Sequence, residues 1–178
     1  MKPEPGTYTL TAANGRMLLH TAREGVAGML GHDLTIEVGT WSATVAVGED
    51  VADCAVTAEI DLTSLTVVDG SGGAKPLSDK DRREIIKNAA KSLNTGKHPR
   101  AEYTAQSVTG TWEAARVEGT LTLNGRSGPL PLEIARDGEQ FVLTGTIVQS
   151  DFGIKPFSAM LGALKLADPV RVTVTAGL

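Results

Sequence analysis

The chain has 178 residues, a formal net charge of −4, 41% hydrophobic residues and 21% charged residues, which suits one globular domain with a single core. Lys and Arg form no basic cluster, which argues against nucleic acid as a partner. The single cysteine, Cys54, excludes an intramolecular disulfide and a multi-cysteine zinc site. We expect Cys54 to act as a small buried hydrophobe.

The first residues and the hydropathy pattern bear on location. Residues 1–6, Met-Lys-Pro-Glu-Pro-Gly, carry no apolar stretch of signal-peptide length, and no later run approaches the roughly 18 apolar residues of a membrane span. These features predict a cytoplasmic protein. A periplasmic or secreted location is the alternative if a leader has been removed.

The first third of the chain reads as β-strands. Residues 7–11 and 17–21 are short β-type runs around Asn14-Gly15, which predicts a hairpin between them. Between residues 34 and 47 the apolar side chains occupy even positions up to Val38 and odd positions from Trp41 onward. This change of alternation at Gly39 predicts a β-bulge or a bend. Residues 54–62 alternate strictly, as in a half-buried strand.

The pattern changes after the glycine-rich break at 70–73. Ser78 followed by Asp81 is typical of a helix cap, and apolar residues then recur at helical spacing. We expect one amphipathic helix, Asp79 to Leu93, whose charged residues are solvated. Its apolar side chains should face inward and cover the strands: Ile85, Ile86, Ala89 and Leu93.

Alternating patterns return after Pro99 and continue to the C-terminus. Asn124-Gly125 and Asp137-Gly138 mark turns, and the small apolar stretch from Ser158 to Leu166 predicts a short helix or a lid. The total is roughly eight or nine antiparallel strands with one helix, which fits a β-sandwich or a closed barrel. A barrel of about eight strands can hold one small ligand.

Five segments, in this order and spacing, resemble the YceI-like family of polyisoprenoid-binding, lipocalin-like barrels. They are residues 58–65 (AEIDLTSL), 77–93, 97–103 (KHPRAEY), 117–126 (VEGTLTLNGR) and 150–154 (SDFGI). The resemblance implies an all-β fold with one inserted helix, an eight-stranded antiparallel lipocalin-like β-barrel over residues 1–178. It also implies that the barrel encloses a long isoprenoid or fatty chain.

Candidate catalytic and metal-binding residues form no convincing motif. Asp151-Phe152-Gly153 matches a kinase tripeptide, but no phosphate loop accompanies it, so Gly153 should permit a turn while Phe152 packs. No Gly-x-Ser-x-Gly elbow occurs. His20, His32, His98 and Asp33 lack the spacing of metal ligands, and Asp33 should cap backbone amides. We therefore predict no enzyme activity, no metal and no cofactor.

Strand parity predicts the residues that face the barrel lumen. Together with Ile86 of the helix, the expected ligand-binding side chains are Val56, Ile60, Tyr103, Leu121, Leu123, Phe141, Leu143, Ile147 and Val172. Small residues share this parity and favour a cavity over a filled core: Ala58, Ala101, Ala105, Gly119 and Gly145.

The interpretation is a passive carrier or sequestering protein. Its expected partner is a long-chain isoprenoid or fatty lipid, whose tail lies in the lumen and whose polar head stays near the mouth. No nucleic acid and no transmembrane segment are expected. The alternatives are an enzyme acting on a hydrophobic substrate in the barrel, and a metal-binding or structural barrel protein. Assembly into a homodimer is a further possibility that the sequence leaves open.

Overall fold

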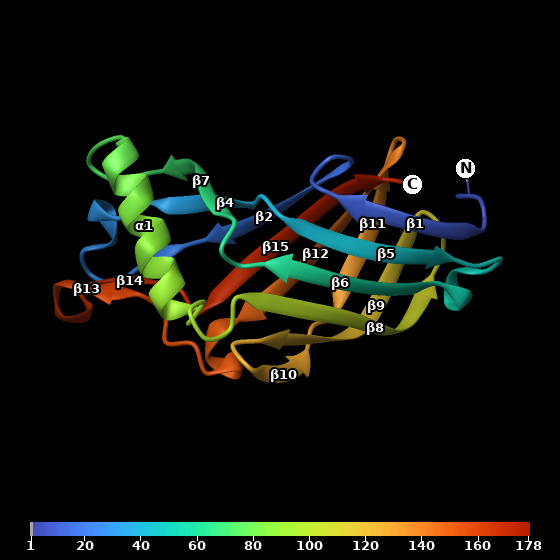
Figure 1. The fold of residues 1–178 in the computed structure, drawn as a ribbon. Coiled ribbons are helices and arrows are strands. Elements are labelled where there is room, and N and C mark those ends of the chain that lie inside the picture. The colour runs from blue at the N-terminus through green and yellow to red at the C-terminus, as the bar shows by residue number, and fades with distance from the viewer. Residues whose placement is uncertain (1) are drawn as a thin grey trace.

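The computed structural model describes residues 2–178, which form an elongated, mostly β molecule with one α-helix (Figure 1). The helices are α1 (Asp79–Ser92) and the short 3-10 helices η1 (Gly28–Leu30), η2 (Val51–Asp53), η3 (Gln149–Phe152) and η4 (Met160–Gly162). The strands are β1 (Gly6–Thr11), β2 (Gly15–Thr21), β3 (Arg23–Glu24), β4 (Asp33–Val38), β5 (Trp41–Val47), β6 (Ala55–Asp61), β7 (Leu65–Ser71), β8 (Arg100–Gly110), β9 (Ala114–Leu123), β10 (Arg126–Pro129), β11 (Leu132–Asp137), β12 (Gln140–Val148), β13 (Ser158–Ala159), β14 (Leu164–Leu166) and β15 (Pro169–Gly177).

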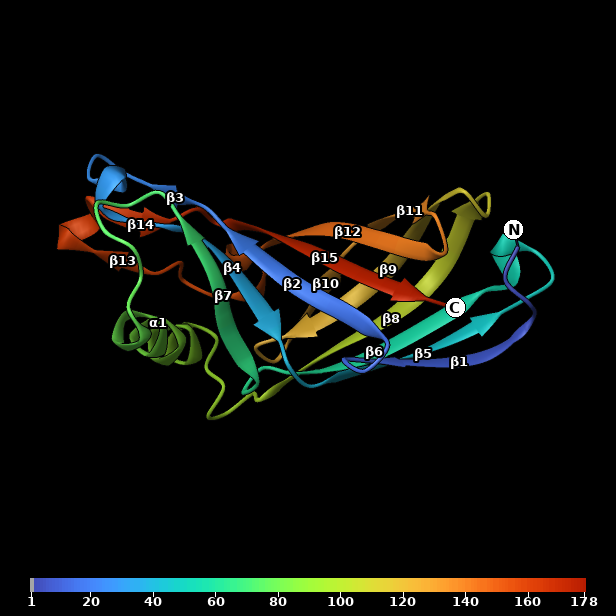
Figure 2. The ribbon, with the colours of Figure 1, turned by 90° about the horizontal axis from the view of Figure 1, so that it is seen from above.

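The main sheet has twelve strands and curls into a half-barrel. Its hydrogen-bonded order is β1-β5-β6-β8-β9-β11-β12-β15-β2-β4-β7, and β10 pairs with β9 beside this path. All of these pairings are antiparallel. A second, three-stranded sheet of β13, β14 and β3 lies at the same end of the molecule as α1 (Figures 1 and 2).

The expected count of eight barrel strands is wrong, because the run at 34–47 divides into β4 and β5, and because β7 and β10 lie outside the strands that the sequence predicts. β4 and β5 are separated at residues 39–40, where the change of apolar parity predicts a break, and β6 and β7 are separated at residues 62–64. The two bends hold each other: the Gly39 amide donates to the Ser64 carbonyl at 2.9 Å, and the Thr40 amide donates to Ser64 Oγ at 2.9 Å. β4 therefore pairs with β2 and β7, whereas β5 pairs with β1 and β6.

The predicted hairpin between the first two strands is also wrong. β1 pairs with β5, and β2 pairs with β15 and β4. Asn14 Oδ1 accepts the Thr11 amide at 2.7 Å, and its Nδ2 donates to the Thr9 carbonyl. Asn14 thus ends β1 instead of building a hairpin turn. Gly15 is needed for packing, because a Cβ there would lie 3.0 Å from the Trp41 ring.

The single helix begins where the sequence predicts. Ser78 and Asp81 form a capping box: the Ser78 amide donates to Asp81 Oδ2 at 2.9 Å, and the Asp81 amide donates to Ser78 Oγ at 3.1 Å. Arg82 Nη1 donates to the Val67 carbonyl of β7 at 2.8 Å. This bond ties the helix to the edge of the sheet.

Turns in the second half agree with the sequence in three places, one of them at Gly138 (φ +63°) between β11 and β12, and one segment differs. Asn124 and Gly125 both have positive φ and join β9 to β10 by a two-residue turn. Phe152 is buried, and Gly153 (φ +68°) turns the chain after η3. Residues 158–166, predicted as a helix or lid, form β13, η4 and β14.

Two clusters of buried side chains lie on the inner face of the curled sheet. One is centred on β2, β4, β5 and β7, with Val38 and Trp41 among its members. The other is centred on β8 and β9, with Tyr103 and Val117. Ala58 and Ile60 of β6 pack against both clusters. The strands therefore build two apolar walls that β6 connects.

Candidate ligand-binding cavity

A cavity of about 820 Å³ lies inside the curled sheet. Its lining includes side chains from β1, β2, β4 to β9, β12 and β15, together with α1. It extends from His32 and Leu77 at the α1 end to Trp112 and Leu178 at the opposite end, where the two termini lie (Figure 1). This volume is within the usual range of small-molecule sites, roughly 300–1,000 Å³.

The expected lumen residues line this cavity, with Ile86 as the exception. Val56, Ile60, Tyr103, Leu121, Leu123, Phe141, Leu143, Ile147 and Val172 all contribute to its wall. Ile86 packs against the cluster of β4, β5 and β7 and is absent from the cavity wall, whereas Ile85, Ala89 and Leu93 line it. Ile86 therefore has a packing role, and its contact with a ligand stays a prediction. Ligand binding by the others stays a prediction.

The small residues differ in what they do for the cavity. Ala58 and Ala101 line it. Gly119 makes room for Tyr103, because a Cβ there would lie 2.2 Å from the Tyr103 oxygen, and Gly145 makes room for Leu132 in the same way. Ala105 packs into the wall of β8 and β9 without lining the cavity. The β8 register shifts just after it, between Ala105 and Ser107, so strand parity fails from there on.

Polar lining residues gather at the α1 end, a group that strand parity misses. One edge of α1 presents Asp81, Glu84, Asn88 and Ser92 to the cavity. These residues follow helical spacing, and the sequence interpretation placed the charged ones among solvated residues. Arg23, His32, Lys75 and Lys165 line the same end from other segments. We call this set of eight side chains the polar rim.

Two adjacent glycines shape the polar rim. Gly72 and Gly73 have φ near +78° and +73°, and a Cβ on either would collide with Arg23 or His32 respectively. The segment after β7 can therefore lie directly over these two side chains. His32 Nε2 is 2.7 Å from the Lys75 carbonyl, and Arg23 Nη1 donates to the Gly31 carbonyl at 2.7 Å. The His32 contact fastens the linker that leads into α1, whereas the Arg23 bond holds its side chain to the loop that follows η1.

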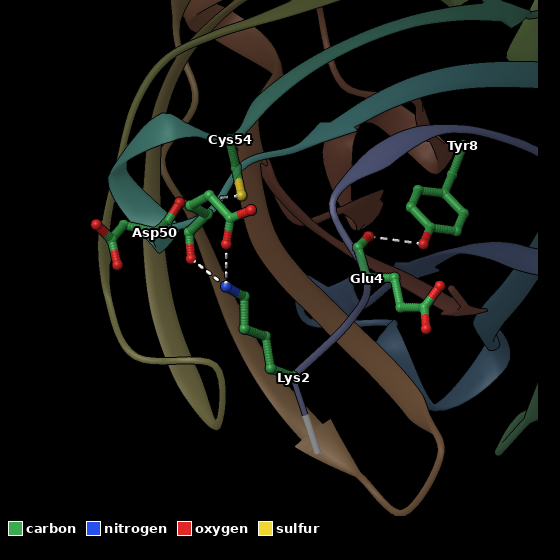
Figure 3. Close-up of polar contacts among 6 residues, drawn as sticks. Lys2, Glu4, Tyr8, Asp50 and Cys54 are labelled. Atoms are coloured by element: carbon green, nitrogen blue, oxygen red, sulfur yellow. Dashed lines mark hydrogen bonds and ion pairs between the residues drawn. The ribbon is translucent and has the colours of Figure 1, made fainter.

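The opposite end carries fewer polar groups and is crossed by the N-terminal segment (Figure 3). Lys2 pairs with Glu49 at 3.0 Å and lies 5.6 Å from the centre of the Trp112 ring. Pro3 lines the cavity beside this pair. Cys54, which is half-buried, also lines the cavity, and its Sγ donates to the Asp50 carbonyl at 3.7 Å.

The histidines do not meet in one place. His20 lies 2.9 Å from Thr173 Oγ1 and shares a shallow outer cleft with Asp33 and Arg171, while His32 lines the main cavity. His98 packs near Gly125. Within residues 2–178, no three His, Cys, Asp or Glu side chains are placed to hold a metal ion. Asp33 accepts the Arg23 amide at 2.8 Å, which is the capping role that the sequence predicts.

Burial, nearby charge and hydrogen bonding change the pKa values of three ionisable groups near these surfaces. Burial raises the pKa of Tyr103 to about 12, and its hydroxyl donates to the Leu130 carbonyl at 3.0 Å. Burial, with Arg171 nearby, lowers the pKa of His20. Hydrogen bonds lower the pKa of Asp81. The larger effect comes from the Ser78 backbone amide and the smaller one from the Ser78 side chain. The lumen therefore keeps Tyr103 neutral at ordinary pH.

The structure thus defines a class: half-open antiparallel barrels with one covering helix and an apolar cavity along the inside. The family model described as "YceI-like domain" matches residues 8–178, and the chain belongs to this family. No curated protein matches the sequence. Within residues 2–178, no helix has both the length and the apolar character needed to cross a membrane.

Two solved structures show the same fold at low sequence identity. The crystal structure of BcnA from Burkholderia cenocepacia has a TM-score of 0.63 and 16% identity, with 92% of this chain and 96% of that chain covered. The YceI protein of Campylobacter jejuni has a TM-score of 0.60 and 15% identity, with coverages of 80% and 82%.

Proposed function

We propose that this protein binds one long-chain amphiphilic lipid, a polyisoprenoid in the first instance, as a carrier or sequestering protein without chemical conversion. The observation that carries the proposal is the cavity of about 820 Å³, whose walls along β6, β8, β9, β12 and β15 are mostly aliphatic. Burying about ten methylene or methyl groups there would contribute roughly 8 kcal/mol before the entropic cost of binding. Membership in the YceI-like family supports the same ligand class.

The ligand orientation follows from where the polar groups lie. The polar rim at the α1 end offers both cationic side chains, such as Arg23 and Lys165, and acceptors, such as Glu84. A hydroxyl or phosphate head group would remain hydrated there, while the tail runs along Ile60 and Leu121 toward the far end. A head group placed deep in the lumen would lose its hydration with few compensating hydrogen bonds.

The proposal is tested by what the protein carries. The freshly purified full-length chain would be examined by native mass spectrometry, extracted with organic solvent, and the extract analysed for lipids. We expect one lipid of long-chain type per chain. If nothing copurifies and the lipid-free protein takes up neither a polyprenyl alcohol nor a fatty alcohol, the proposal is wrong. The expected cytoplasmic location is tested separately by fractionation of the host cells.

A further inference from the structure

Two loops at the α1 end expose six large apolar side chains, and no other part of the described chain gathers so many. Residues 25–31 and 156–164 contain no charged side chain, whereas Lys155 and Lys165 border the second stretch. We call these two loops the apolar tip. Its exposed members are Val26, Met29, Leu30, Phe157, Met160 and Leu161, with 92% of Val26 and 76% of Met29 exposed. Large exposed apolar groups of this kind mark sites of interaction.

The apolar tip is built by specific contacts, although its loops are more than 120 residues apart. β3 pairs with β14, with Arg23 opposite Leu166, and the Ala27 amide donates to the Ala163 carbonyl at 2.8 Å. Gly25 (φ +99°) is required here, because a Cβ would lie 2.3 Å from that same carbonyl. The two loops therefore form one surface.

Part of the backbone of the apolar tip is hydrogen-bonded within the two loops. The amides of Gly28, Leu30 and Gly31 donate to carbonyls within the first loop at 3.0–3.1 Å, and the Ala163 amide donates to the Met160 carbonyl. Each amide that is paired within a loop lowers the cost of moving that loop into a weakly hydrated environment. This property suits the boundary between lipid head groups and acyl chains.

Backbone strain holds apolar side chains outward at the same place. Met160 and Leu161 both have positive φ, 52° and 55°, in a region that L-residues other than Gly, Asn and Asp adopt rarely. Strained conformations of this kind persist where the surrounding structure enforces them and often mark functional segments. Here the strained pair is exposed to solvent in the absence of a partner.

The apolar tip continues into the cavity. Leu30 and Phe157 belong to the apolar tip and also line the cavity, next to Arg23 and Lys165 of the polar rim. We propose that the apolar tip inserts shallowly into a lipid bilayer and places the cavity mouth at the surface from which the ligand is taken or to which it is returned. The direction of transfer rests on the proposed function, but insertion itself does not.

A lipid surface fits these loops better than a protein partner does. A typical protein interface includes about ten direct hydrogen bonds, whereas residues 25–31 and 156–164 offer no charged side chain and a single hydroxyl, that of Ser158. Two of the three cationic side chains at their base are paired, Arg23 with Asp33 and Lys165 with Glu24. Attraction is therefore expected to come from apolar insertion, with little dependence on anionic lipid.

The test is sedimentation of the full chain with vesicles of pure phosphatidylcholine, repeated with added phosphatidylglycerol. We expect the wild type to bind both, and Met29→Asp and Leu161→Asp each to lower the bound fraction at least fivefold. Ala52→Asp is the control, because Ala52 is exposed, does not line the cavity and lies in η2, which follows β5 at the opposite end of the molecule (Figure 1). It should bind as the wild type does.

The outcomes separate this inference from the proposed function. Uptake of a fluorescent polyprenyl alcohol, measured without vesicles, should be unchanged in both loop variants because they leave the cavity intact. The inference is overturned if the wild type does not sediment with either vesicle, or if both loop variants bind like the wild type. It is also overturned if gel filtration shows a wild-type dimer that both variants dissociate, since a second copy would then cover the apolar tip.

Discussion

Tyr103 places a neutral hydroxyl in a mostly apolar wall, and its ionisation opposes folding. The pKa is about 12 in the folded chain and near 10 when unfolded, so the unfolded state loses its proton first as the pH rises. Tyr103 adds no pH dependence to stability well below pH 10, and its effect should lower the free energy of unfolding by roughly 1–2 kcal/mol between pH 10 and 12. Denaturant titrations of the wild type and Tyr103→Phe at pH 8 to 12 would show this loss only in the wild type. Parallel curves would contradict the assignment.

Gly119 is required because Tyr103 occupies the space of its missing side chain. A Cβ would lie 2.2 Å from the Tyr103 oxygen and 2.9 Å from the Thr104 carbonyl, and the latter cannot move without disturbing β8. We expect Gly119→Ala to destabilise the protein by about 1–3 kcal/mol. Gly96→Ala is the matched control, because nothing lies within 4 Å of a Cβ there. Thermal unfolding of both variants measures the difference, and equal melting temperatures would refute it.

At the scale of single residues, alternation along strands predicts most of the cavity wall. It succeeds for Val56, Leu121 and Leu143 because their strands keep regular pairing. It fails beyond Ala105, because the register shift in β8 turns Val108 inward instead. A bulge of this kind depends on the neighbouring strand, which local periodicity does not record.

The covering helix separates anchoring residues from lining residues. Ile86 packs against the strands, whereas Asn88 lies at the cavity. Ile86→Ala should cost about 2 kcal/mol of stability and leave the ligand affinity of the folded protein within threefold. Asn88→Ala should leave stability nearly unchanged. Thermal unfolding and ligand titration measure stability and affinity in both variants. A large loss of affinity with unchanged stability in Ile86→Ala would show that Ile86 contacts the ligand.

The capping box sets where this cover begins. Ser78→Ala removes the acceptor for the Asp81 amide and should destabilise the protein by about 1 kcal/mol. Ser107→Ala, at an exposed strand position, is the control. Because hydrogen bonds from Ser78 lower the pKa of Asp81, the contribution of this carboxylate is present at neutral pH and is lost as the pH falls through the lowered pKa. A wild type and a Ser78→Ala variant with equal melting temperatures at pH 7 would contradict the role of the cap.

At the scale of elements, helices and tight turns are predictable and strand pairing is less so. The start of α1 and the Asn124-Gly125 turn depend on local chemistry, which the sequence records directly. The partners of β1 and β2 depend on the bend at Gly39, which sends β5 to β1 and β4 to β2. The sequence predicts this bend. Which strands pair on either side of it depends also on the contact between Gly39 and Ser64, which lies 25 residues further along the chain.

At the scale of the whole molecule, the bends at residues 39–40 and 62–64 give an elongated curled sheet with two distinct ends. One end carries α1, the polar rim and the apolar tip, and the other carries both termini. This polarity favours a ligand that is itself polar at one end and apolar along its length. The family resemblance predicts a curled antiparallel sheet with one helix, but the polar rim becomes visible only when segments distant in the sequence are brought together.

Titration of a radiolabelled polyprenyl alcohol into the lipid-free protein tests the central claim most directly, with Ala58→Trp as the decisive variant. Ala58 lines the cavity between the two apolar walls, so an indole there should fill the lumen and weaken binding at least tenfold, about 1.4 kcal/mol. Thr57→Trp, at the exposed neighbouring position on β6, is the matched control, and circular dichroism verifies that both variants fold. The account predicts one bound ligand per chain for the wild type and Thr57→Trp, and much weaker binding for Ala58→Trp. Equal affinity in all three proteins, or no binding by the wild type, would contradict it.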